Sequence, residues 1–174
     1  MIQIRHSIFE TNSSSTHAIC ISRKPVKVAH PSRLHFSIGE YGWELDRLST
    51  PEEKASYLYT AMLDICEAHD TDELVNQVQC EIRNAVEPAG IICTFEEPEF
   101  EVTPYGSYLQ VGYIDHASDC AKFVYAVMHD RDLLLRYLFS PDSFVGTGND
   151  NSHDWGEIVG EASKCTHEIF EKWN

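Results

Sequence analysis

The sequence predicts an α+β fold: one globular domain over residues 1–174, with a mainly antiparallel sheet covered by about four helices. Three observations support this prediction. The length suits one domain with one hydrophobic core, since domains commonly hold about 100 to 200 residues. Segments with strand periodicity and segments with helical spacing are grouped rather than strictly alternating, which is typical of α+β folds. No internal repeat or Ser/Pro-rich linker divides the chain.

Three strands are expected in the N-terminal part of the chain. Apolar side chains alternate along residues 2–8, and residues 18–21 form a second apolar segment after a polar loop. Two such segments joined by a loop predict a hairpin-like unit. Leu34, Phe36 and Ile38 alternate with polar residues, which indicates a third strand with one buried face.

Two helices are expected after position 49. Thr50 offers an N-cap hydroxyl, Pro51 suits the first helical position, and Glu53 stands where a capping box needs an acid. A second helix is expected to begin after Asp70 and to end before Pro88. Side chains at helical spacing are predicted to face the core: Leu58, Met62, Ile65, Cys66 and His69, then Leu74, Val75, Val78, Ile82 and Val86.

The second half of the chain predicts strands followed by a broken helix. Residues 91–114 indicate two or three strands with a turn at 105–106. Residues 117–139 have helical spacing that is interrupted near Asp130, which can cap a second helical segment.

The C-terminal region predicts a short strand, a loop and a weak helix. Phe144 and Val145 indicate the strand. Residues 146–151 predict a loop, because Gly, Asn and Asp favour turns. The tail at 154–173 predicts a weaker helix, since its internal glycines lower helix propensity.

The formal charge of −15 is the strongest feature of the composition. It argues against direct binding of nucleic acid, because phosphate contacts need a basic surface. The charge is uneven: residues 1–49 hold six Lys/Arg and four Asp/Glu, whereas residues 50–174 hold seven and twenty-four. The acidic part can attract a protein with a basic surface, although high net charge also serves solubility alone.

Location and redox state follow from the same composition. Apolar runs are far shorter than the roughly 20 residues of a membrane-spanning helix, so no membrane association is expected. The first twenty residues lack a basic start and an apolar core, so no signal peptide is expected. A cytoplasmic location follows as an expectation, with the six cysteines as thiols.

A polar segment at residues 10–17 is the first candidate site. Its hydroxyls and backbone N–H groups can hold a phosphate or carboxylate, with a nearby cation completing the site. A serine activated by His17 is a second interpretation, although no glycine-flanked elbow surrounds the serines. A solvated turn is the third. The candidate ligand-binding residues are Arg5, Glu10, Asn12, Ser13, Ser14, Ser15 and His17.

A second polar segment at residues 146–151 adds Asn149 and Asp150 to the candidate ligand-binding residues. Its glycines permit close approach of the backbone to a ligand. The calcium-loop pattern that starts at Asp150 fails, because Trp155 stands where the turn needs glycine. His/Cys pairs occur without matched knuckles for zinc. We therefore predict no metal site, and the sequence assigns no cofactor.

Glu97, Glu99 and Glu101 are the candidate partner-binding residues. On a strand they would share one face at intervals of roughly 7 Å, forming an acidic ridge. Such a ridge can imitate a nucleic-acid backbone toward a basic groove. The alternative is the charged face of an edge strand, protected against aggregation.

Residues 5–17 carry the pattern R-x-x-x-F-E-T-N-S-S-S-T-H, which resembles the N-terminal motif of a family of small phage- and prophage-encoded proteins. Residues 144–151 are similar to a second motif of that group. The resemblance implies an origin in a mobile element and a place in the host-cell cytoplasm. It also implies that the chain binds and inhibits a host enzyme or remodels nucleotide pools.

Two functions remain open at this stage. The first is an acidic accessory protein that binds a basic surface of a host nucleic-acid-handling or defence enzyme and inhibits that enzyme. The alternative is a domain that binds or processes a phosphorylated, nucleotide-like small molecule with the segments at 11–17 and 146–151. The first is favoured, because no nucleophile, base and orienting group can be assigned together.

Overall fold

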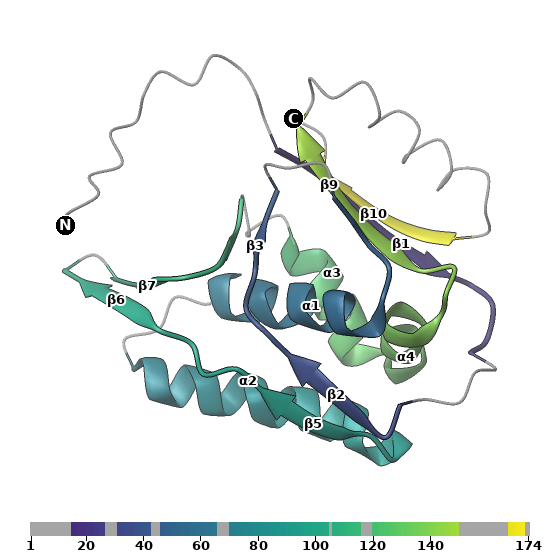
Figure 1. The fold of residues 1–174 in the computed structure, drawn as a ribbon, viewed down its shortest axis with the longest axis horizontal. Coiled ribbons are helices and arrows are strands. Elements are labelled where there is room, and N and C mark those ends of the chain that lie inside the picture. The colour runs from purple at the N-terminus through teal and green to yellow at the C-terminus, as the bar shows by residue number, and fades with distance from the viewer. Residues whose placement is uncertain are drawn as a thin grey trace.

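The computed structural model describes residues 15–26, 31–42, 46–65, 70–104, 106–115, 120–149 and 167–172 (Figure 1). Its helices are α1 (Pro51–Ile65), α2 (Thr71–Val86), α3 (Ala121–His129) and α4 (Arg131–Phe139). The strands are β1 (Ser15–Ser22), β2 (Arg33–Phe36), β3 (Glu40–Tyr41), β4 (Asp46–Leu48), β5 (Ile92–Phe95), β6 (Phe100–Thr103), β7 (Gly106–Leu109), β8 (Tyr113–Ile114), β9 (Phe144–Asn149) and β10 (His167–Lys172). The predicted α+β class is confirmed.

The largest sheet is antiparallel throughout and has the strand order β10-β1-β9-β4. Its inner strand β1 pairs with β9 and β10, which come from the far end of the chain. Within the described residues, no hairpin partner precedes β1, and the strand expected at residues 2–8 lies outside them. Local sequence suggested a hairpin, but long-range pairing supplies both neighbours of β1.

Two C-terminal predictions are wrong. Residues 146–149 continue β9 instead of forming a loop, because they pair with β1 on one side and, at Gly146 and Thr147, with β4 on the other. Residues 167–172 form β10 rather than a helix, because they pair with β1. Ladder hydrogen bonds thus outweigh the weak strand propensity of glycine. The rest of the expected C-terminal helix lies outside the described residues.

Helix α1 occupies the centre of the fold, between the large sheet and α2 (Figure 1). Its start is the predicted capping box: Glu53 N–H donates to the Thr50 hydroxyl at 3.2 Å, and Thr50 N–H donates to the Glu53 carboxylate at 2.9 Å. Every residue from Lys54 to Leu63 is buried, which is typical of a helix packed on all sides. Of its predicted inward residues, Cys66 and His69 lie outside the described chain.

Polar side chains of α1 also satisfy the backbone beside it. Ser37 N–H donates to the Ser56 hydroxyl at 3.1 Å, and Gly39 N–H donates to the Thr60 hydroxyl at 3.1 Å. Further along, Ile114 N–H donates to the Asp64 carboxylate at 2.9 Å. These bonds hold the connection after β2 and the short strand β8 against the helix.

The starts of α2 and α4 follow the predictions closely. Asp70 caps α2 through a 3.1 Å bond from Glu73 N–H, and Asp130 caps α4 through a 3.0 Å bond from Leu133 N–H. Gly90, with φ of +84°, closes the turn after α2 in the left-handed conformation that glycine adopts most easily.

Three smaller strand pairs lie beside the helices. The pairs β2–β5 and β3–β8 are parallel, whereas β6–β7 is an antiparallel ribbon. This ribbon extends away from the large sheet, on the side where α2 begins (Figure 1). Residues 91–114 were expected to hold two or three strands, and the structure has four there, β5 to β8.

Candidate functional site

The ribbon of β6 and β7 has one face toward the core and one toward solvent. Phe100 and Leu109 are cross-strand partners, and both pack against the hydrophobic core. The next pair, Glu101 and Tyr108, therefore projects on the opposite side of the ribbon. Glu101 is exposed, and 56% of the Tyr108 surface is accessible to solvent. The ribbon thus holds an acid and an aromatic ring side by side on an outer face.

The ladder continues one step beyond β6, where Gln110 N–H donates to the Glu99 carbonyl at 2.7 Å. Strand alternation places Glu99 and Gln110 on the same side as the pair before them. We call Glu99, Glu101, Tyr108 and Gln110 the acidic ribbon face. All four residues are exposed.

The three glutamates were expected to lie on one strand, but the strand β6 contains only one of them. Only Glu101 lies within β6, and Glu97 and Glu99 precede the strand. Pro98 stands between them and lacks the N–H that a regular ladder would use. All three glutamates are nevertheless exposed, and Val111, with 60% of its surface accessible, follows the ribbon closely in the chain.

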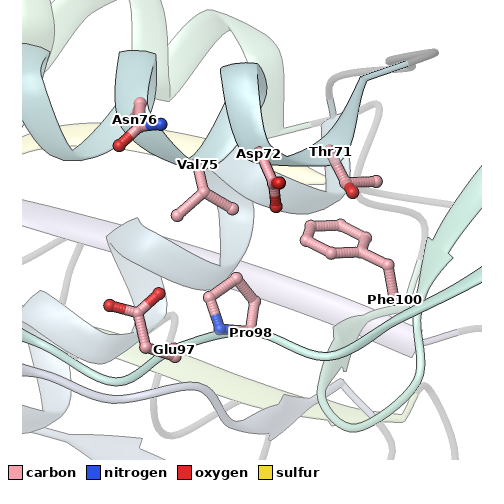
Figure 2. A pocket seen from close by; sticks show the side chains of 7 residues that line it. All are labelled: Thr71, Asp72, Val75, Asn76, Glu97, Pro98 and Phe100. Carbon is pink, nitrogen blue, oxygen red and sulfur yellow. The ribbon is translucent and has the colours of Figure 1, made fainter.

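A cavity of about 400 Å³ lies between the start of α2 and the segment that leads into β6. Its lining consists of Thr71, Asp72, Val75, Asn76, Glu97, Pro98 and Phe100. Figure 2 shows Asp72 and Glu97 on opposite walls, with Val75 and Pro98 between them and the Phe100 ring near Asp72. Sequence reasoning missed this cavity, because its walls come from segments more than twenty residues apart.

The two predicted ligand segments meet at one end of the large sheet. Ser15 pairs with Asn149, and His17 pairs with Thr147. In their described parts, residues 15–17 and 146–149, the two segments are neighbouring strands of one sheet. The side chains of Ser15 and Asn149 are not described. Arg5, Glu10, Asn12, Ser13, Ser14 and Asp150 lie outside the described residues.

His17 is buried, with 3% of its surface accessible, instead of facing a surface loop. Its Nδ1 lies 3.1 Å from the Tyr57 hydroxyl, which also lies 3.2 Å from Cys120 Sγ. Burial, followed by the nearby Cys120, raises the pKa of Tyr57 well above its ordinary value. Tyr57 and Cys120 are 63 positions apart, so sequence spacing carried no signal for this cluster.

Among the described residues, no three His, Cys, Asp or Glu side chains are grouped as a metal ion requires. The helices that the structure describes lack the combination of length and apolar character needed to cross a bilayer. Comparison with known proteins gives no match to a protein-family model, to a curated protein or to a solved structure.

Proposed function

We propose that this chain acts by binding another protein, with the acidic ribbon face against a basic surface of that partner. The observation that carries the proposal is the exposed cross-strand pair Glu101 and Tyr108, held outward because Phe100 and Leu109 pack against the core. An exposed acid beside an exposed ring combines the two properties that such an interface needs.

The two side-chain types would make different contributions. Carboxylates speed association with a basic partner and set its orientation, and both effects weaken as salt increases. Buried aromatic side chains supply much of the affinity at protein interfaces. The formal charge of −15 extends the attraction beyond the contact itself.

For the partner we propose a host enzyme that handles nucleic acid or serves in defence, which this chain would inhibit. The support is the resemblance of residues 5–17 to a motif of phage-encoded proteins, together with the acidity of the ribbon. A groove that binds nucleic acid presents the basic surface that a row of carboxylates can occupy.

The test compares what co-purifies from host cells with the natural chain and with two charge-matched double variants. Glu99→Lys/Glu101→Lys changes the acidic ribbon face, and Glu81→Lys/Glu87→Lys changes exposed acids at the far end of α2. We expect a complex that dissociates as salt increases, is lost in the first variant and is kept in the second. Equal retention by both variants would exclude the ribbon as the binding surface.

A second candidate function is binding of a phosphorylated small molecule near the paired positions Ser15 and Asn149. The pairing supports it, because it brings together two polar segments separated by most of the chain. The test is thermal denaturation with and without a panel of nucleotides, using Arg5→Ala and Ser14→Ala. Stabilisation that is present in the natural chain and lost in both variants would support this function. An absence of nucleotide stabilisation in the natural chain would oppose it.

A further inference from the structure

The cavity beside α2 adjoins the proposed interface. Glu97 is both a wall of this cavity and the first residue of the glutamate row, and Phe100 lies in β6, the strand that carries Glu101. Phe100 faces the cavity from the core side of the ribbon, whereas Glu101 projects on the other side, so a partner must extend around β6 from the acidic ribbon face to reach the cavity as well. The inference below rests on the proposed function and deepens it.

The cavity has both acidic and apolar walls, and this combination favours a ligand group that is positively charged and partly apolar. Asp72 and Glu97 face it from opposite sides (Figure 2), and within the described residues neither carboxylate has a hydrogen-bond or ion-pair partner. Val75, Pro98 and the Phe100 ring supply apolar surface between them. The two carboxylates would repel a phosphate group, so a phosphate ligand is disfavoured here even though the start of a helix favours anions.

We propose that this cavity receives an arginine side chain from the partner protein. A guanidinium group has five N–H donors and can bond carboxylates on both sides at once. Its aliphatic stem can pack on Val75 and Pro98, while the planar cation lies against the Phe100 ring. Neutral asparagine and threonine side chains in the lining, Asn76 and Thr71, offer further acceptors.

The part of the chain that the structure describes contains the same kind of contact at two places. The Arg47 guanidinium carbon lies 4.0 Å from the centre of the Phe144 ring, and that of Arg83 lies 4.7 Å from the centre of the Phe95 ring. The size of the cavity, about 400 Å³, falls within the range of roughly 300 to 1,000 Å³ that is usual for ligand sites. Arginine is favoured over lysine because lysine lacks a planar group that can stack on the Phe100 ring and donate hydrogen bonds to the two carboxylates.

The test is an NMR titration of the full chain with N-acetyl-arginine amide, which represents the partner's side chain. N-acetyl-citrulline amide serves as the uncharged probe of nearly the same shape. We expect saturable shifts of the Asp72, Val75 and Phe100 amides with the arginine probe and much weaker shifts with citrulline. Shifts spread over all acidic surfaces without saturation would show that no arginine site exists.

Variants then separate the cavity from the ribbon. Asp72→Asn/Glu97→Gln, at two exposed positions where folding should be unaffected, is expected to weaken arginine binding about tenfold. Phe100→Leu, which removes the ring, is expected to weaken arginine binding, and Glu81→Gln, at an exposed position toward the far end of α2, should leave it unchanged. Unchanged binding in the double variant would overturn the arginine site. If the arginine site fails in this way while Glu99→Lys/Glu101→Lys still abolishes the complex, the proposed function stands without it.

Discussion

Lys54 and Ser140 are joined inside the protein, although 86 positions separate them. The Lys54 ammonium donates a 3.0 Å hydrogen bond to the Ser140 carbonyl, and a second one to the Ser143 carbonyl. Only 1% of the Lys54 surface is accessible. Ser140 follows the last turn of α4, where the helix dipole favours a positive charge. This contact ties the start of α1 to the end of α4.

The first prediction concerns this contact. Lys54→Met should lower the free energy of unfolding by about 2 kcal/mol, because two buried carbonyls lose their donor. Lys24→Met is the matched control, since Lys24 forms an exposed ion pair with Asp142 beside the same segment. We expect a change within about 0.5 kcal/mol for the control. Urea denaturation measures both, and equal effects would show that the buried contact adds nothing.

The second prediction is a pH dependence. Burial lowers the pKa of Lys54 from 10.5 to about 8. Between these pH values the unfolded chain binds more protons at this site than the folded chain, so the site's contribution to stability increases with pH and is lost as pH falls toward 8.

The natural chain should therefore gain stability over Lys54→Met as pH rises from 8 to 10.5. Cys93, whose pKa is raised to about 11 by burial and then by Glu87, acts in the opposite direction. It is present in both chains and cancels in the comparison. The measurement is the difference in free energy of unfolding across this range. A difference that stays constant with pH would contradict the prediction.

The third prediction concerns Gly42, which has φ of +126°. A Cβ atom there would lie 2.8 Å from Asp115 Cβ and 3.0 Å from His17 Nε2. Gly90 also has positive φ, but a Cβ atom there would meet nothing within 4 Å. Gly90→Ala should therefore cost about 1 kcal/mol from backbone strain alone, and Gly42→Ala about 2 kcal/mol more. Thermal denaturation tests this ranking. Equal losses of stability in the two variants would mean that the side chains of Asp115 and His17 move aside at no cost.

The fourth prediction tests the meeting of the two polar segments. Ser15 and Asn149 are cross-strand partners, so Ser15→Cys/Asn149→Cys should form a disulfide on mild oxidation. Thr16→Cys/Asn149→Cys, shifted by one residue, should link far less, because adjacent residues point to opposite faces. Peptide mapping by mass spectrometry identifies the linked pair. Equal linking in both variants would contradict the register of β1 and β9.

Local sequence determined the starts of α1, α2 and α4. The caps at Thr50 and Asp130 were predicted from single side chains, because a helix start needs a nearby acceptor for its free N–H groups. The start of a helix after Asp70 was also predicted, and the structure adds that Asp70 caps it. The inward positions Leu74 and Ile82 followed from helical spacing. For the candidate site, the sequence predicted Glu97, Glu99 and Glu101 as exposed acids, and they are exposed.

Only the tertiary structure decided the strand pairing and what lies beside the acids. Gly146 lies in a strand because β1 and β4 both pair with it, and no local pattern reports partners that distant. The burial of His17 and Lys54 likewise depends on segments far away in the chain. The same holds for Tyr108 next to Glu101 and for the cavity between α2 and β6. The physical reason is that caps and periodicity act within a few residues, whereas sheets, buried polar contacts and cavities form when distant segments pack together.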